Sequence, residues 1–245
     1  MNKEAKWLLD EKYKGLESEA FQDDLKLLES GTPLAYIIGN IPFYNCTIDL
    51  EYKPLIPRTE TEYWVHQFIE KELGDKKAEV LDIFSGSGCI GVSVLKNTEN
   101  TKVDFAELQE NNIKQIKKNL KLNNIEEKRY HVLDSDVFQN IKDKKYDYIL
   151  ANPPYISEDK KSDVQKSVLE YEDRLALFAK EQGLFFIDKL IKESKKYLKD
   201  GGQVYIEYDS WQTEKIKELL KENNITDFKI IEDQYDKDRV LMFSY

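Results

Sequence analysis

The sequence predicts an α/β fold in which a mostly parallel sheet is covered by helices on both faces. From Ala78 onward, short apolar β-type runs alternate with helical patterns, which is typical of a parallel sheet. A glycine-rich loop, Ser85–Gly88, follows the first of these runs and opens a helix. A later apolar run, Tyr146–Ala151, ends abruptly in Asn-Pro-Pro-Tyr at positions 152–155. These three features define the expected fold.

The first part of the chain is expected to form a small helical region followed by a β-hairpin. Apolar side chains recur at helical spacing in residues 3–29, with a break near Ser18, and Gly31-Thr32-Pro33 ends the segment. The expected β runs are Tyr36–Ile38, Phe43–Tyr44 and Thr47–Leu50, separated by turn signals. The chain therefore divides into a short helical region (1–33), a β-hairpin linker (34–57) and a main domain (58–245).

The main domain is expected to begin with a helix and to continue as alternating strands and helices. Thr59 or Thr61 is expected to cap the helix Glu62–Leu73, and residues 74–77 form a linker. The expected strands are Val80–Phe84, Lys102–Ala106, Arg129–Leu133, Tyr146–Ala151, Val204–Glu207, Phe228–Glu232 and Val240–Phe243. The expected helices are Cys89–Lys96, Gln109–Leu122, Leu184–Leu198 and Thr213–Asn223. The last two strands are expected to pair antiparallel, so the sheet has seven strands.

The composition and net charge of the chain argue against several classes of function. The chain has 245 residues and a net charge of −10, so it lacks the broad basic surface of a duplex-DNA binder. Two cysteines and two histidines without zinc-type spacing predict no metal site. A Cys46–Cys89 disulfide stays open, although no secretory segment indicates an oxidising compartment. The sequence has no apolar run of about eighteen residues, so we expect no membrane-spanning segment. We expect the protein to be a cytoplasmic monomer that does not bind membranes and does not bind nucleic acid stably.

The glycine-rich loop has the spacing of a nucleotide-binding loop. Gly86, Gly88 and Gly91 form a GxGxxG pattern that allows a tight turn and close approach of a ligand to the backbone. Glu107 lies 21 residues after Gly86, where an acidic side chain can accept hydrogen bonds from both ribose hydroxyls. The pattern fits a dinucleotide and S-adenosylmethionine equally well. The later Asn-Pro-Pro-Tyr turn favours S-adenosylmethionine, because nicotinamide chemistry gives no reason for such a turn.

Asp136 and Val137 follow the third strand of the main domain. Asp136 could accept a hydrogen bond from the amino group of adenine, with Val137 or Phe138 covering the ring. The alternative is that Asp136 caps a helix. Both interpretations stay open at this point.

The Asn-Pro-Pro-Tyr turn is the strongest single signal. Each proline lacks an N–H and fixes φ near −65°, so the strand must stop at Asn152. This leaves the Asn152 side chain, the carbonyl of Pro153 and the ring of Tyr155 without strand partners. Two acceptors beside an aromatic face suit a planar group that donates two hydrogen bonds. A primary amide and an exocyclic amine both fit.

With these motifs, the chain resembles the HemK-type protein-(glutamine-N5) methyltransferases, which modify peptide chain release factors. The resemblance covers nearly all of residues 31–243. It rests on the segments Gly31–Gly39, Leu55–Glu62, Phe84–Gly88, Asn152–Tyr155, Tyr171–Phe178 and Asp233–Val240, together with Glu107 and Val137. The resemblance implies a class I S-adenosylmethionine-dependent methyltransferase fold, that is, a Rossmann-like, mostly parallel seven-stranded sheet.

The resemblance also implies roles for individual residues. The expected cofactor-binding residues are Phe84, Ser85, Gly86, Ser87, Gly88, Glu107, Asp136, Val137 and Asn152. Asn152, Pro153, Pro154 and Tyr155 are expected to bind the substrate, and Asn152, Pro153 and Tyr155 to act in catalysis. The implied substrate is the glutamine of the Gly-Gly-Gln loop of a release factor, with residues 1–33 as a docking region. The alternative is an N6-adenine methyltransferase acting on DNA or RNA.

Three departures from the family pattern stand out. The region before Gly31 is shorter than is usual for the family. Phe84 stands where a glycine is common in the cofactor loop. The segment after Glu207 lacks a glycine that is usual there.

Overall fold

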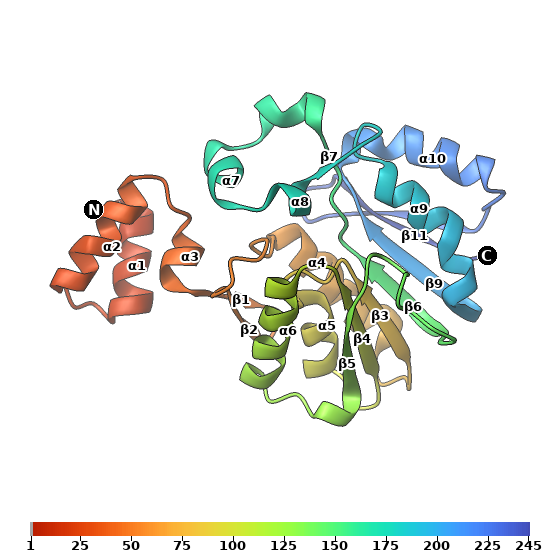
Figure 1. Cartoon of the computed structure of the whole chain (residues 1–245), viewed down its shortest axis with the longest axis horizontal. Coiled ribbons are helices and arrows are strands. Elements are labelled where there is room, and N and C mark those ends of the chain that lie inside the picture. Colours follow the sequence, from red (N-terminus) through yellow and green to blue (C-terminus); the bar gives the residue numbers. More distant parts are fainter. Residues whose placement is uncertain (1) are drawn as a thin grey trace.

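The computed structural model describes residues 2–245, which form a seven-stranded sheet with helices on both faces and a helical unit at one end (Figure 1). The strand order is β10-β11-β9-β6-β3-β4-β5, and only β11 runs against the others. The strands are β3 (Glu79–Ile83), β4 (Lys102–Glu107), β5 (Tyr130–Asp134), β6 (Tyr146–Ala151), β9 (Leu198–Glu207), β10 (Phe228–Glu232) and β11 (Asp238–Phe243). The predicted mostly parallel sheet and its antiparallel closing pair are confirmed.

Helices cover the two faces of the sheet because alternate residues of each strand point to opposite sides. In β3, Val80 belongs to one buried core and Leu81 to the other. The first core packs under α4 (Thr59–Gln67), α5 (Cys89–Lys96) and α6 (Glu110–Leu122). The second packs under α9 (Phe185–Glu193) and α10 (Thr213–Glu222). The sheet is thus buried on both sides, as its near-continuous apolar strands require.

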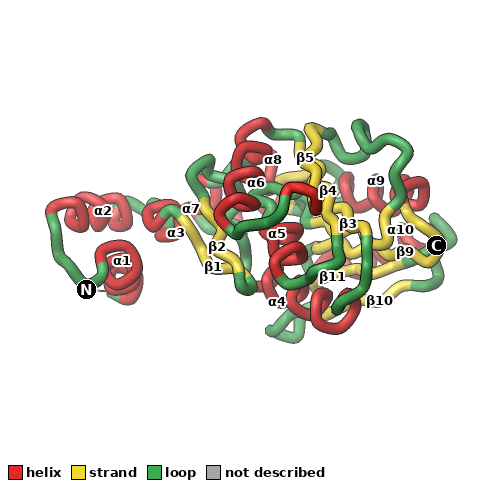
Figure 2. The backbone as a smooth tube through the Cα atoms, turned by 90° about the horizontal axis from the view of Figure 1, so that it is seen from below, coloured by secondary structure: helices red, strands yellow, loops and turns green. Residues whose placement is uncertain are grey.

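The N-terminal helices form a separate small unit, visible at one end of the molecule in Figure 2. Asn2 caps α1 (Lys3–Tyr13) and Ser18 caps α2 (Glu19–Glu29), which confirms the predicted break near Ser18. The helix α3 (Leu34–Ile38) completes the unit, and its core contains Leu8, Phe21 and Ile37. This core is small and separate from the two cores of the sheet.

The expected strand at Tyr36–Ile38 is wrong, because these residues lie in α3. The carbonyl of Pro33 accepts hydrogen bonds from Tyr36 and Ile37, and Gly39 ends the turn in the left-handed region at φ 89°. Burial of Ile37 in the N-terminal unit outweighs the weak β preference of two adjacent isoleucines. The hairpin itself is confirmed, with β1 (Asn40–Phe43) paired to β2 (Cys46–Asp49).

Two further expectations on element ends need correction. The helix α4 begins at Thr59, so neither Thr59 nor Thr61 caps it, and the chain continues as a π-helical turn, Phe68–Leu73. The helix α9 ends at Glu193, followed by a 3-10 turn, Ser194–Tyr197, and β9 already begins at Leu198. Gly201, at φ 75°, lies in a bulge of β9 where the pairing with β6 shifts register, so the glycines interrupt a strand and do not end a helix.

Residues 156–179 form an irregular segment that arches over one end of the sheet (Figure 1), and the sequence analysis assigned no elements to it. It contains β7 (Ile156–Ser157), a 3-10 helix (Glu158–Asp163), α7 (Lys166–Tyr171), α8 (Arg174–Leu177) and β8 (Phe178–Ala179). The buried carboxylate of Glu172 accepts hydrogen bonds from Arg58 Nη2 at 2.7 Å and from the backbone N–H of Ile56 at 3.2 Å. These bonds tie the segment to the end of the linker.

Across residues 2–245, the helices are too short or too polar to cross a membrane. The same residues contain no group of three His, Cys, Asp or Glu side chains arranged to hold a metal ion. Cys46 and Cys89 are both buried and both free.

Candidate active site

The order of the strands creates a site at one end of the sheet. The chain runs outward from β3 through β4 to β5 and then returns to the other side of β3 as β6. The loops after β3 and β6 therefore diverge, and such a switch point leaves a crevice at the carboxyl ends of the strands. The glycine-rich loop follows β3 and the Asn-Pro-Pro-Tyr turn follows β6, so the fold brings the two strongest motifs together.

A hollow of about 760 Å³, including the space at its mouth, lies at this switch point and is called the inner cavity here. The predicted residues on its wall are Phe84, Gly86, Glu107, Asp136, Val137, Asn152 and Pro154. They come from the ends of four adjacent parallel strands, β3, β4, β5 and β6. Leu55, Leu108, Leu175 and Phe186 add apolar walls that sequence reasoning had not singled out.

Ser85, Ser87 and Gly88 are not on the wall of the inner cavity, and they shape the loop instead. Ser85 Oγ donates to the carbonyls of Asp82 (2.7 Å) and Ala106 (3.2 Å). Gly88, at φ 78°, ends the loop and precedes α5, where an added Cβ would lie 3.1 Å from Ile116. The direct cofactor contacts expected of these three residues stay predictions.

Glu107 holds the glycine-rich loop in place. Its carboxylate accepts hydrogen bonds from the backbone N–H of Gly86 at 2.8 Å, of Leu108 at 3.0 Å and of Gln109 at 2.8 Å. Glu107 is only 7 % exposed, yet it lies on the wall of the inner cavity. A carboxylate fixed by three N–H groups is preorganised, and its remaining lone pairs suit a pair of ribose hydroxyls.

Two non-glycine residues on the cavity wall have strained backbones. Phe84 has φ 60° and Val137 has φ 51°, in the region that favours glycine. A glycine would adopt the Phe84 conformation at lower cost. The Phe84 ring packs edge-to-face on Phe186, with centroids 5.0 Å apart, and this contact offsets part of the strain. Val137 is held by Ser135, whose Oγ donates to the Val137 carbonyl at 2.9 Å.

The helix-cap interpretation of Asp136 is wrong, because residues 136–140 form a turn and not a helix. The carbonyl of Asp136 accepts from the N–H of Gln139 at 3.0 Å. The Asp136 side chain is exposed and lies at the inner cavity. The structure therefore leaves the Asp136 carboxylate available to a ligand, and the contact to adenine stays a prediction.

A second hollow, the outer cleft, adjoins the inner cavity. Its walls include Arg58, Pro153, Tyr155, Val168 and Arg239. Three residues line both hollows: Leu55, Asn152 and Ala176. Asn152 therefore lies where the two hollows meet. Because the outer cleft is open and carries both apolar and charged walls, it suits a loop of another macromolecule.

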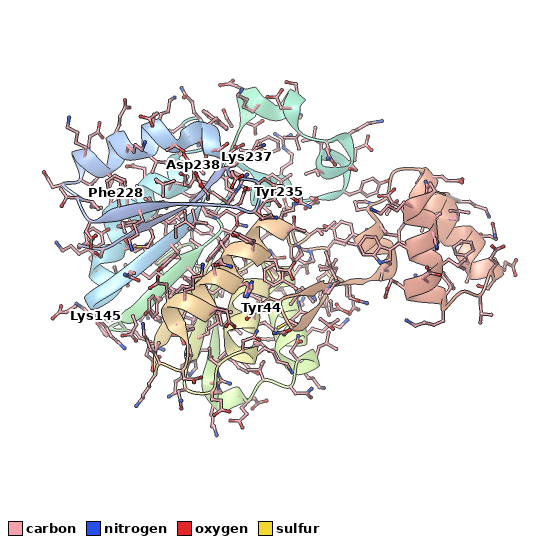
Figure 3. All side chains as sticks on the ribbon, turned by 180° about the vertical axis from the view of Figure 1, so that it is seen from behind. Tyr44, Lys145, Phe228, Tyr235, Lys237 and Asp238 are labelled. Carbon is pink, nitrogen blue, oxygen red and sulfur yellow. The ribbon has the colours of Figure 1, made fainter. Side chains whose placement is uncertain are left out.

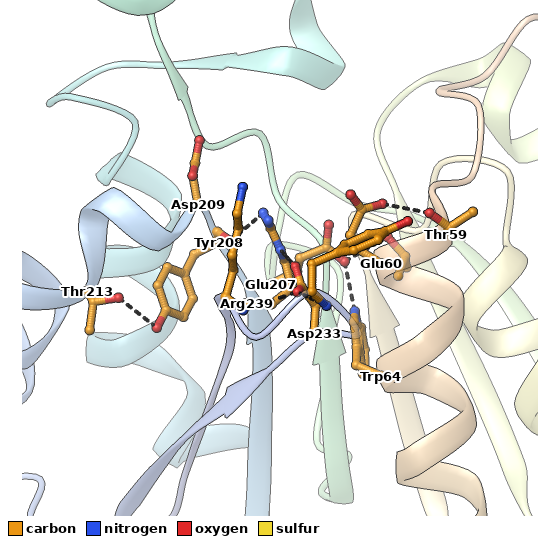
Figure 4. Close-up of polar contacts among 12 residues, drawn as sticks. Thr59, Glu60, Trp64, Glu207, Tyr208, Asp209, Thr213, Asp233 and Arg239 are labelled. Atoms are coloured by element: carbon orange, nitrogen blue, oxygen red, sulfur yellow. Dashed lines mark hydrogen bonds and ion pairs between the residues drawn. The ribbon is translucent and has the colours of Figure 1, made fainter.

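A buried glutamate that sequence reasoning had not singled out supports the Asn-Pro-Pro-Tyr turn. Glu207, at the end of β9, accepts a hydrogen bond from Trp64 Nε1 at 2.7 Å (Figure 4). It also accepts one from Thr61 Oγ1 at 2.7 Å. The Tyr155 hydroxyl donates to its other oxygen at 3.3 Å, and Asn152 Nδ2 donates to Thr61 Oγ1 at 3.2 Å. Burial raises the pKa of Glu207, and the Trp64 and Thr61 hydrogen bonds oppose that shift.

The backbone of Tyr155 is also fixed by residues that lie just before α9 and α10. Gln212 Nε2 donates to the carbonyls of Tyr155 at 3.1 Å and of Gln182 at 3.0 Å. Gly183 passes so close that an added Cβ would lie 1.9 Å from the Tyr155 carbonyl oxygen. The sequence indicated only that the segment after Glu207 departs from the family pattern. The contacts of Gln212 and Gly183 with Tyr155 became visible only in the fold.

The β10–β11 turn contributes to the same end of the sheet. Tyr235, Lys237 and Asp238 mark this turn in Figure 3, whereas Lys145 marks the opposite end, before β6. Antiparallel pairing places Val240 beside Glu207. Arg239 thereby reaches the outer cleft, where its Nε donates to Asp233 Oδ2 at 3.0 Å.

The fold and the site together define a class I S-adenosylmethionine-dependent methyltransferase. Residues 62–175 match the methyltransferase small domain family. Among solved structures, the human METTL16 catalytic domain in complex with an RNA hairpin is 19 % identical, with a TM-score of 0.64 over 82 % of this chain and 76 % of that one. A methyltransferase from Pyrococcus furiosus is 17 % identical, with a TM-score of 0.60 over 91 % of this chain and 96 % of that one. These likenesses show the fold.

Sequence relatives give the family. The chain is 32 % identical to the release factor glutamine methyltransferase of Streptococcus pneumoniae, over 92 % of this chain and 80 % of that protein. It is 34 % identical to the enzyme of the same name from Thermodesulfovibrio yellowstonii, over 86 % of this chain and 75 % of that protein. The chain belongs to the release factor glutamine methyltransferase family.

Proposed function

We propose that this protein transfers a methyl group from S-adenosylmethionine to the side-chain amide nitrogen of the glutamine in the Gly-Gly-Gln loop of a peptide chain release factor. The observation that carries the proposal is the position of Asn152, which lies between the inner cavity and the outer cleft. A group held by Asn152 from the outer cleft would face a cofactor in the inner cavity. Family membership supports the same reaction.

The walls of the inner cavity fit S-adenosylmethionine in chemistry. Glu107 offers a buried carboxylate for the ribose, Asp136 a free carboxylate for the adenine amino group, and Leu108 and Val137 apolar surface for the ring. When bound, the cofactor supplies an electrophilic methyl group on a positively charged sulfur. Phe84 and Phe186 close the other wall with an aromatic pair and limit the access of water.

The contribution of the protein to the reaction is mainly placement. An amide nitrogen is a poor nucleophile because its lone pair is delocalised into the carbonyl. Asn152 Oδ1 and the Pro153 carbonyl would each accept one N–H of the glutamine amide and stabilise the positive charge that grows on the nitrogen. Tyr155 would pack on the amide plane. In the best intramolecular cases such positioning lowers a barrier by about 7–11 kcal/mol.

The same proposal gives each part of the chain a role. Residues 1–33 would help to dock the release factor, and residues 58–245 would carry out the reaction. Residues 34–57 would connect these two parts. Because Val168 and Leu177 line the outer cleft, we expect the irregular segment 156–179 to provide part of the docking surface beside it. We further expect the protein to act as a cytoplasmic monomer.

The decisive experiment is methyl transfer from labelled S-adenosylmethionine to a purified release factor. A matched factor with the loop glutamine changed to alanine serves as the control. Label on the intact factor alone would establish both the reaction and the target residue. Absence of label, with cofactor binding confirmed by calorimetry, would contradict the proposal, and labelled adenine in nucleic acid would then support the alternative substrate.

The first prediction concerns Asn152. Asn152→Ala should leave the affinity for S-adenosylmethionine largely intact but lower methyl transfer by about 100-fold or more, the scale of a lost transition-state hydrogen bond. Single-turnover transfer and calorimetry measure the two effects separately. Turnover close to that of the wild type would rule out the role given to Asn152.

A further inference from the structure

Behind Asn152 lies a hydrogen-bonded network that the reaction scheme above does not use. Thr61, in α4, lies between Asn152 and Glu207, with its Oγ1 3.2 Å from Asn152 Nδ2 and 2.7 Å from Glu207 Oε2. Thr61 and Glu207 are each 1 % exposed, so water does not compete for the bond between them, whereas the bond to Asn152 is partly buried. The network joins three elements that are distant in sequence: α4, the turn after β6 and the end of β9.

The chemistry of the donors and acceptors fixes the direction of every bond. Trp64 and Tyr155 donate to Glu207, and Arg239 lies near it. All three favour the ionised carboxylate against the effect of burial. An ionised carboxylate only accepts, so the Thr61 hydroxyl gives its single proton to Glu207. Trp64 Nε1, a donor only, binds the same oxygen. The Thr61 oxygen then has only lone pairs left for Asn152. Asn152 must therefore turn its NH₂ group toward Thr61, which leaves Oδ1 on the other side of the amide.

The second oxygen of Glu207 supports the other end of the same turn. Burial, and then the charge of Glu207, raise the pKa of Tyr155, so its phenol keeps the proton and donates to Glu207 Oε1 at 3.3 Å. Arg239 lies close enough to oppose the effect of burial on the pKa of Glu207. Asp233 and the Tyr208 carbonyl hold the Arg239 guanidinium at 3.0 and 3.2 Å (Figure 4).

We propose that Thr61 and Glu207 are positioning residues that set the amide orientation of Asn152 and thereby make the site selective for an NH₂ group. With Oδ1 turned away from Thr61, the turn offers two acceptors, Oδ1 and the Pro153 carbonyl. In the flipped orientation, Nδ2 would face the substrate and repel its N–H. The inference rests on the proposed function, because it assigns a role to these residues in the proposed reaction.

The test compares three single substitutions. Thr61→Val keeps the shape but removes both hydrogen bonds, whereas Thr61→Ser keeps the hydroxyl. Trp64→Phe removes the other donor to the same carboxylate oxygen and leaves Thr61 and Asn152 in contact. For each variant, methyl transfer, cofactor affinity and thermal unfolding are measured. The side-chain amide signal of Asn152 is followed by NMR in the cofactor-free protein.

We expect Thr61→Val to lower kcat by about 10- to 100-fold, the range for hydrogen-bond partners of ligating residues in metal sites. Its cofactor affinity should not change, and Thr61→Ser should restore the rate. Trp64→Phe should lower the melting temperature but lower kcat much less than Thr61→Val does, because Thr61 stays in contact with Asn152. The Asn152 NH₂ protons should exchange with water faster in Thr61→Val than in the wild type.

Two results would overturn the inference: a wild-type rate in Thr61→Val, or equal losses of rate in Thr61→Val and Trp64→Phe, which would indicate a purely structural role. Failure of the proposed function is distinguishable, because the wild-type protein would then transfer no methyl group to the release factor. In that case the Asn152 amide signal still decides the orientation. Unchanged exchange in Thr61→Val would refute it, and faster exchange would support it.

Discussion

Two buried carboxylates control the site at the scale of single residues. Glu107 accepts hydrogen bonds from three backbone N–H groups and shapes the glycine-rich loop. Glu207 accepts hydrogen bonds from three side chains and shapes the Asn-Pro-Pro-Tyr turn. A buried carboxylate destabilises the fold unless its oxygens accept hydrogen bonds, and each of these two carboxylates accepts three. Each one therefore acts as a rigid reference point for a loop that lacks regular structure.

Glu107→Ala should weaken binding of S-adenosylmethionine by about 10- to 100-fold, since hydrogen bonds to a charged group contribute roughly 1.5–3 kcal/mol. The same change leaves the N–H of Gly86 without its acceptor. Calorimetric titration measures the affinity. Glu110→Ala is the matched control, because Glu110 is exposed and pairs with Lys114 on the surface, so its loss should leave the affinity unchanged. Equal affinities for wild type and Glu107→Ala would remove Glu107 from the site.

At the scale of elements, the packing of α5 on the sheet depends on Gly91. The Gly91 N–H donates to Asp82 Oδ2 at 2.9 Å, and an added Cβ would lie 2.3 Å from the Phe105 ring. The third glycine of the GxGxxG pattern thus allows close contact between helix and sheet. Because α5 begins directly after the glycine-rich loop, a shift of this helix would also move the loop.

Gly91→Ala should lower the free energy of unfolding by about 1–3 kcal/mol, the usual cost of overpacking a core. Denaturant unfolding of the single and double variants measures it. In Gly91→Ala/Phe105→Leu the smaller side chain makes room, so the cost of the alanine should be smaller than in the wild-type background. Strictly additive costs would show that the Phe105 ring is not the obstacle.

At the scale of the whole molecule, the hairpin belongs to the main core. In β2, the backbone N–H groups of Thr47 and Asp49 donate to Asn123 and Asn119 of the α6 region at 3.0 and 2.8 Å. Cys46 is buried in the same core as Cys89. The region 34–57 therefore joins the two units physically, but most of it is expected to fold with the sheet.

The reactivity of the Cys46 and Cys89 thiols tests whether the hairpin folds with the sheet. Burial raises the pKa of the Cys89 thiol to about 12 and also raises that of Cys46, so the reactive thiolate is scarce at pH 8. Neither thiol should react with a thiol reagent in the native protein, and both should become reactive in one transition as denaturant is added. Reaction of Cys46 at a clearly lower denaturant concentration than Cys89 would show that the hairpin unfolds independently.

The sequence by itself determined the sheet, most of its helices and the two loops of the site. These features have local causes: apolar runs of strand length, glycines that permit a tight turn, and prolines that stop a strand at Asn152. The resemblance to known methyltransferases added the cofactor and the substrate, and the relatives confirm the family. One expected strand, Tyr36–Ile38, proved to be part of helix α3, and the other errors lay at element ends such as the start of β9, where burial and register outweigh local preference.

Only the tertiary structure decided which side chains support the loops. Thr61 reads as a helix cap and Glu207 as the last residue of a strand, yet they meet because α4 packs across the carboxyl end of β9. The same holds for Gln212 and Gly183 beside Tyr155. Such contacts join residues far apart in the chain, and no periodicity encodes them. The sequence therefore specifies the reacting groups, and the packed fold specifies their orientation.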